Sequence, residues 1–89
     1  MILFIDGNKL TSPETAHPYL KEKLEFPDYY GCNLDALHEC LTDICEETCF
    51  LIGPVSPFDM TPYYGRVLEV FKDSEKENPR ITVECFEED

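Results

Sequence analysis

The segment Cys49-Phe50-Leu51-Ile52-Gly53-Pro54 decides the fold, because it is a short apolar run that ends in a strong turn signal. Such a run is typical of a strand that is buried on both faces of a parallel sheet. Two further strands are predicted, one at residues 2–5 and one at residues 81–86. The first is wholly apolar and is predicted to be buried on both faces, whereas the last alternates with period two and is predicted to be a half-buried edge strand. Because residues 49–52 are the most apolar, we expect them in the centre of the sheet.

Two helices are predicted from their start signals. Thr15 can cap a helix over residues 16–24, which places Pro18 in the first turn, where a missing N–H breaks no bond. An earlier start near Ser12 is the alternative. A Thr-Pro pair, an N-cap followed by proline at the first helical position, opens a second helix over residues 62–77.

Between these two helices, Asn33 is predicted to cap another. Its apolar residues recur at helical spacing and form one stripe, Leu34, Leu37, Leu41 and Ile44. Parallel strands need long crossover connections, and both connections here are long enough and helical. The sequence therefore predicts an α/β fold, a three-stranded parallel sheet with three to four helices packed against it, in a single domain over residues 1–89.

The charge balance favours a basic partner. Seven Lys and Arg residues against 19 Asp and Glu residues give a formal net charge of −12, so nucleic acid and anionic membranes are expected to be repelled. The alternative is that the acidity serves solubility alone. No apolar run approaches the length of a membrane span and no signal peptide is visible, so we expect a cytoplasmic protein. We expect it to be monomeric when free.

Neither a metal nor a catalytic centre is predicted. The five cysteines are odd in number and contain no C-x-x-C spacing, so reduced thiols are expected rather than disulfides or structural zinc. No nucleophile, base and orienting group occur in a recognisable pattern, so we expect no enzyme and no cofactor. A metal site is an alternative for one helical surface, which carries Asp35, His38, Glu39 and Asp43.

The polar side of the helix that begins at Asn33 is unusual for a merely solvated face, which is the alternative interpretation. Asp35 and Glu39 form a like-charged pair at i,i+4, which destabilises an isolated helix. No Lys or Arg lies between Lys23 and Arg66 to neutralise them locally. Tyr29 and Tyr30 come just before the helix. Carboxylates beside tyrosine rings suit Arg and Lys side chains, so this surface predicts a basic protein partner.

Residues 26–42, Phe-Pro-Asp-Tyr-Tyr-Gly-Cys-Asn-Leu-Asp-Ala-Leu-His-Glu-Cys-Leu-Thr, resemble the signature segment of the barstar family. The shared pattern, P-[DE]-Y-Y-G-x-N-L-D-A-L, is long and specific. The resemblance implies a three-stranded parallel sheet, a cytoplasmic location, and inhibition of a basic, secreted, barnase-like ribonuclease by blocking its active site. The alternative is an acidic interaction module with an unrelated basic partner.

The resemblance also implies a set of partner-binding residues. Glu39 stands where the family has an aspartate that fills the nuclease's anion site, and His38 stands where it has a tryptophan. Being adjacent, His38 could hydrogen-bond Glu39. Residues 54–60 are shorter than in the family, so a helix there is reduced or absent. The complete set is Tyr29, Tyr30, Gly31, Asn33, Leu34, Asp35, His38, Glu39, Thr42, Val70 and Asp73.

Overall fold

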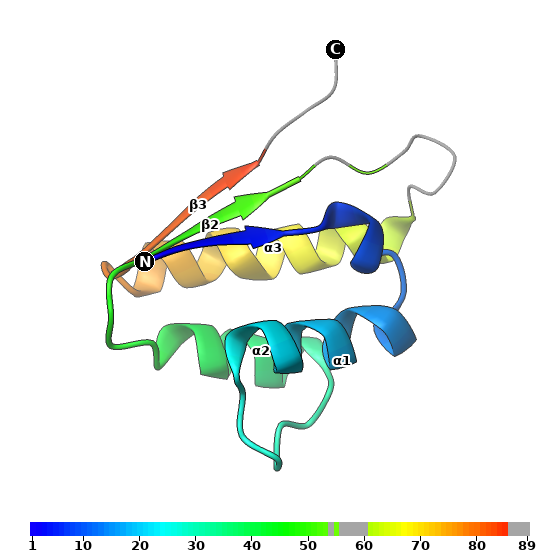
Figure 1. Ribbon diagram of the computed structural model, residues 1–89, viewed down its shortest axis with the longest axis horizontal. Coiled ribbons are helices and arrows are strands. Elements are labelled where there is room, and N and C mark those ends of the chain that lie inside the picture. Colours follow the sequence, from blue (N-terminus) through cyan, green and yellow to red (C-terminus); the bar gives the residue numbers. More distant parts are fainter. Residues whose placement is uncertain (54, 56–60, 86–89) are drawn as a thin grey trace.

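The computed structural model describes residues 1–53, 55 and 61–85. Its elements follow the order β1 (Ile2–Ile5), η1 (Gly7–Lys9), α1 (Pro13–Leu24), α2 (Leu34–Thr42), β2 (Thr48–Ile52), α3 (Pro62–Glu77) and β3 (Ile81–Cys85). The strands form one sheet in the order β1-β2-β3, and both pairs are parallel (Figure 1). The predicted α/β class, the parallel sheet and the central position of residues 49–52 are confirmed.

Among the described residues, the helices cover one face of the sheet. Figure 1 shows α1, α2 and α3 on the same side of the three strands. In register, Phe50 lies between Leu3 and Val83, and this row points toward the helices because Phe50 is fully buried. The next row contains Ile5 and Ile52, which are also fully buried. The core therefore lies between the sheet and the three helices.

The prediction that β1 is buried on both faces is wrong. Ile2 is 70% exposed and Phe4 is 54% exposed, whereas Ile5 is buried. Side chains alternate between the two faces of a strand, and none of the described helices lies over the face that carries Ile2 and Phe4. The apolar run at residues 2–5 thus identified β1 as a strand, but it did not show whether one face or both faces of the strand would be buried.

Capping residues set the starts of the helices. The side chain of Asn33 accepts a hydrogen bond from the Ala36 amide at 2.7 Å, and α2 begins where predicted. Thr61 caps α3, whose predicted bounds are confirmed. The first helix begins at the alternative start, with Ser12 as N-cap and proline at the first helical position, which suits a residue without an N–H. Pro18 consequently lies inside α1 rather than in its first turn.

The two remaining predictions about local structure fall outside the described residues. They concern a reduced helix within residues 54–60, of which only Val55 is described, and the extension of the last strand to residue 86. Among residues 1–53, 55 and 61–85, no helix combines the length and hydrophobicity that a membrane span requires.

Candidate protein-binding surface

Three exposed carboxylates line one side of α2. Asp35, Glu39 and Asp43 are spaced four residues apart, so they lie above one another on the helix, and we call them the acidic face. Asp35 lies near the positive N-terminal end of the helix dipole, but Asp43 is the C-cap, where a negative charge is unfavourable. The last turn carries no basic residue to offset it. Helix stability therefore does not explain this arrangement.

The loop that precedes α2, residues 26–33, is called here the contact loop. Figure 1 shows it projecting from the helices on the side away from the sheet. Tyr29 at its tip is 88% exposed. Tyr30 is only 6% exposed, its amide donates to the Pro27 carbonyl at 2.9 Å, and its ring packs on Phe26. The prediction that both tyrosines are available to a partner is thus wrong for Tyr30, which the turn directs into the core.

A buried histidine anchors the contact loop. The Nδ1 atom of His17 lies 2.7 Å from the hydroxyl oxygen of Tyr30, and its Nε2 atom is hydrogen-bonded to the hydroxyl of Tyr63. The three side chains link α1, the contact loop and the start of α3. Burial lowers the pKa of His17, and burial also raises the pKa of Tyr30 well above its ordinary value. A neutral imidazole with two neutral phenols is therefore the stable form, with one ring nitrogen donating and the other accepting.

The backbone of the contact loop is held against the start of α2. The Asn33 side chain donates to the Gly31 carbonyl at 3.2 Å while it caps the helix. A Cβ at Gly31 would approach the Asn33 amide nitrogen to 3.2 Å, so glycine permits this close contact. Cys32 between them has φ 52°, a left-handed conformation that costs a non-glycine residue about 1–2 kcal/mol. Leu34 is half-buried at the first position of α2.

His38 does not bond to Glu39, contrary to expectation. Its Nε2 atom lies within hydrogen-bonding distance of the carboxylate of Glu77, on α3. Successive helical residues point about 100° apart, so His38 can reach α3 while Glu39 points to solvent. Within the described residues, Glu39 takes part in no ion pair. The imidazole is therefore engaged by α3, and the Glu39 carboxylate is left available.

The other predicted residues border the acidic face. The Thr42 hydroxyl donates to the carbonyl oxygens of His38 and Glu39, each at 3.0 Å, so only its lone pairs remain for a partner. On α3, Asp73 is exposed one turn before Glu77, and Val70 is half-buried against the core. The structure thus brings this part of α3 beside α2, through the contact of His38 with Glu77.

The far end of α2 is held by a residue that the sequence suggested only as a helix stop. Asn78 is 5% exposed, and its side-chain amide donates to the carbonyl oxygens of Leu41, Thr42 and Ile44 at 3.0–3.2 Å. It occupies the C-cap of α3. Nothing local marks this role, because the bonded residues lie 34 to 37 positions away. The same holds for His17 and Tyr63, 46 positions apart.

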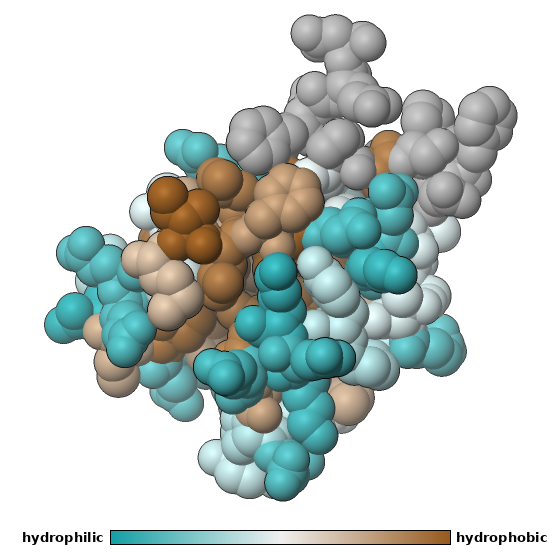
Figure 2. Space-filling model, in the orientation of Figure 1, coloured by the Kyte–Doolittle hydropathy of each residue, from teal (hydrophilic) through white to brown (hydrophobic). Residues whose placement is uncertain are grey.

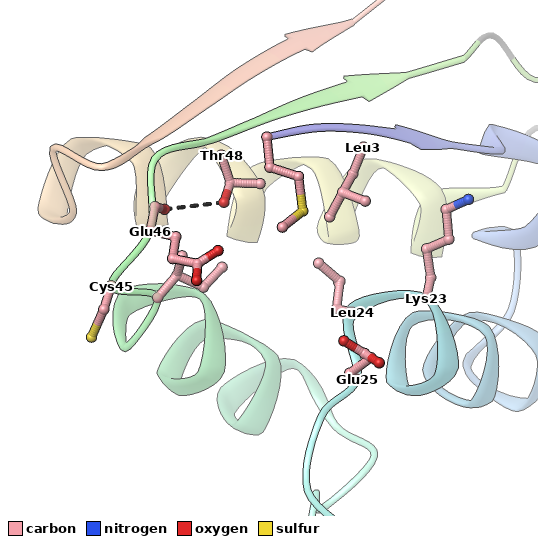
Figure 3. Close-up of a pocket in the computed structure, with 9 residues that line it drawn as sticks. Leu3, Lys23, Leu24, Glu25, Cys45, Glu46 and Thr48 are labelled. Carbon is pink, nitrogen blue, oxygen red and sulfur yellow. Dashed lines mark hydrogen bonds between the residues drawn. The ribbon is translucent and has the colours of Figure 1, made fainter.

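The metal alternative receives no support. In the described part of the chain, no three His, Cys, Asp or Glu side chains are placed to share an ion. A groove of about 420 Å³ lies elsewhere, between the start of the sheet and the ends of α1 and α2 (Figure 3). Leu3, Leu24 and Ile44 give it an apolar floor, and Lys23 and Glu25 are at its rim. It does not include the acidic face.

Comparison with known proteins identifies the family. The family model described as "Barstar (barnase inhibitor)" matches residues 1–87. A protein of Bacillus subtilis strain 168, named "Putative ribonuclease inhibitor YrdF", is 41% identical over 78 residues, which cover 84% of this chain and 86% of that protein. Members of this family are inhibitors rather than enzymes, in agreement with the prediction of no catalytic centre. The chain belongs to the barstar family of barnase inhibitors.

Proposed function

We propose that this protein inhibits a basic, secreted, barnase-like ribonuclease in the cytoplasm, by placing its acidic face and contact loop over the nuclease active site. The observation that carries the proposal is the state of the charges on α2. Asp35 and Glu39 are exposed on the same side, while the imidazole of His38, next to Glu39 in the sequence, is engaged by Glu77. A ribonuclease cleft is built to hold phosphates, and these carboxylates present the same charge.

The roles of the individual residues follow from their geometry. Glu39 has the longer arm and points to solvent, so it is the group that enters the anion site. Asp35 lies one turn nearer the contact loop and can accept a bidentate bond from an arginine. The exposed Tyr29 ring offers a surface on which a cation or guanidinium can stack. Gly31, Asn33 and Leu34 set the shape of the loop, and Thr42, Val70 and Asp73 form the rim.

The test is inhibition of purified barnase by the parent protein and by charge-removing variants. Glu39→Gln and Asp35→Asn should each weaken binding by about 2 kcal/mol or more, which is the scale of an interface hot spot. Glu84→Gln is the matched control, because it removes the same charge from an exposed position on the uncovered face of the sheet. It should weaken binding by no more than a few tenths of a kcal/mol.

Equal losses for all three variants would show that only net charge matters and would contradict a defined acidic face. Tight binding that leaves the nuclease active would contradict inhibition and would favour the interaction-module interpretation. Loss of inhibition in Tyr29→Ala, with Tyr30→Phe retaining it, would separate the exposed ring from the buried one.

A further inference from the structure

The two edges of the sheet are treated differently. At β3, the Val83 amide donates to the Glu75 carboxylate at 2.5 Å, and the Ile81 amide donates to the Asn78 carbonyl at 3.2 Å. The amides of Ile81 and Val83 both point away from β2, because the hydrogen bonds between β2 and β3 use the backbone groups of the alternate residues of β3. The outward amides of Ile81 and Val83 on the edge of β3 are therefore occupied by groups from α3 and its C-cap.

The outer edge of β1 has no such cover. The backbone amide of Cys49, in β2, donates to the Met1 carbonyl, and the amide of Gly53, just after β2, donates to the Ile5 carbonyl. The backbone groups of the odd-numbered residues of β1 therefore point toward β2. The N–H and C=O groups of Ile2 and Phe4 consequently point outward. Among the described residues, the edge is closed only at its end, where the Asp6 amide donates to the Tyr19 hydroxyl at 2.9 Å.

The side chains at this edge are apolar and exposed. Met1, Ile2 and Phe4 are 66%, 70% and 54% exposed. Figure 2, which looks toward β1, shows hydrophobic surface gathered over this strand and hydrophilic surface over α1 below it. Natural proteins usually protect an edge strand with charge, proline or a bulge, and β1 has none of these. An uncovered edge with apolar side chains is a template for another strand.

We propose that the β1 edge pairs with the β1 edge of a second copy of this chain. In an antiparallel pair about a two-fold axis beside Leu3, Ile2 of each copy lies opposite Phe4 of the other. These are the residues whose backbone groups point outward, so each pair exchanges two N–H···O=C bonds and the two pairs form four. The product is a continuous six-stranded sheet with helices on one face.

Charge below the edge supports a second copy as the occupant. Tyr19, whose hydroxyl reaches the end of the edge, lines one hollow together with Glu22, Lys23 and Glu25. Lys23 also extends toward β1 at the rim of the groove in Figure 3. A two-fold axis beside Leu3 places the Glu22, Lys23 and Glu25 cluster of one copy next to the same cluster of the other, so each Lys23 can meet a carboxylate across the axis.

The association is expected to be weak. A fully buried Phe contributes roughly 150–250 Å², so the exposed half of Phe4 offers about 100 Å². The paired edges together remain below the roughly 1,200 Å² of a stable standard interface. Each copy also carries a net charge of −12, which opposes association until salt screens it. The sequence predicts a monomer when free, and the proposed dimer departs from that prediction at high protein concentration and high salt.

The proposal does not rest on the ribonuclease proposal, because β1 lies at the sheet and the contact loop projects from the opposite side of the molecule (Figure 1). The test is sedimentation equilibrium of the full chain from about 10 µM to about 1 mM, at about 50 mM and about 500 mM salt. The parent should reach a dimer and no larger species, and its association should strengthen with salt. Amide hydrogen exchange at Ile2 and Phe4 should slow as the dimer forms.

The decisive variant is Ile2→Lys, which places a charge at the edge and should weaken dimerisation at least about tenfold. Thr82→Lys is its matched control, since Thr82 is exposed on the same face of the sheet in β3 and gains the same charge. It should dimerise as well as the parent, and both variants should inhibit the nuclease as the parent does. A monomer at every concentration and salt would overturn the proposal. So would a dimer that Ile2→Lys leaves intact, or one in which exchange at Ile2 and Phe4 does not change.

Discussion

The acidic face with its contact loop and the outer edge of β1 are both exposed to solvent, but they differ in charge and in how they are held. The acidic face and contact loop carry charge and are held by polar side chains, namely the exposed Asn33 and the buried His17 and Asn78. The β1 edge carries apolar side chains on a bare backbone and has no polar brace beneath Ile2 or Phe4 among the described residues. Like charges four residues apart destabilise the helix that carries them, so α2 needs stabilising hydrogen bonds from other elements. A strand edge is already held by its ladder.

The strongest test of this contrast removes one anchor. Asn78→Ala removes the side-chain donor that three carbonyl oxygens at the end of α2 share, and only the Leu41 oxygen keeps a backbone donor, the Ile44 amide, among the described residues, so the free energy of unfolding should fall by about 2–3 kcal/mol. Urea denaturation measures the loss. Lys76→Ala, an exposed position in the last turn of α3, is the control and should change stability by at most about 0.5 kcal/mol. A comparable result for the two variants would mean that α2 does not depend on this anchor.

Raising the ionic strength should have opposite effects on the two surfaces, slowing association with the nuclease and strengthening dimerisation. Association of the acidic face with a basic nuclease is steered by opposite charges, so its rate constant should fall about tenfold or more between about 50 mM and about 500 mM salt. Dimerisation through β1 joins two copies of charge −12 and should strengthen over the same range. Stopped-flow mixing measures the first and sedimentation the second. If both respond in the same direction, charge does not distinguish these surfaces.

Lowering the pH should reduce the stability that the buried His17 contributes through its hydrogen bonds with Tyr30 and Tyr63. Burial lowers the pKa of His17 in the folded state, so below its ordinary value of 6.5 the unfolded chain binds a proton that the folded chain does not. The stability that His17 contributes is complete above that pH and is lost as the pH falls toward its folded pKa, at up to about 1.4 kcal/mol per pH unit. The measurement is urea unfolding of the parent and of His17→Gln from pH 7.5 to 5 in steps of about one unit. The difference between them isolates His17 from the other titrating groups, and His38→Gln is the control. Parallel profiles for the parent and His17→Gln would contradict this prediction.

The smallest expected effect concerns the stability of the free protein. Glu39→Gln should change its free energy of unfolding by only a few tenths of a kcal/mol, because Glu39 is exposed and has like charges at i−4 and i+4. Asp43→Asn should be stabilising by a similar amount, since it removes a negative charge from the C-cap. Thermal unfolding at low salt resolves such shifts. A large loss for Glu39→Gln would show that this residue has a structural role in addition to binding.

Local signals were sufficient for the three strands and for α2 and α3, whereas α1 begins at the alternative start near Ser12. Asn33 and Thr61 cap the helices that follow them, and the apolar run at residues 49–52 is the central strand, as its composition predicts. The covered face of β1 could not be predicted in the same way. Whether Ile2 and Phe4 are buried depends on which side of the sheet the helices pack, and that is a property of the whole chain.

The candidate surface shows the same division. The acidic residues of α2 follow from helical spacing, and their exposure was correctly anticipated. The inward turn of Tyr30 and the pairing of His38 with Glu77 were missed, because each depends on a partner from another element. Asn78 and His17 were missed for that reason too. A sequence pattern shows which residue types share a face, but not which distant residue will engage them.

The carboxylate of Glu75 on the β3 edge has a consequence for the size of any assembly. A sheet with two uncovered edges can add strands at both ends and grow into a fibre. Here the β3 edge is occupied by Glu75 and Asn78. Pairing between two copies uses the β1 edge of each, so no free edge remains among the described strands. Growth therefore stops after a single step, as in any closed two-fold assembly. The Glu75 carboxylate and the Asn78 carbonyl thus limit the proposed assembly to two copies.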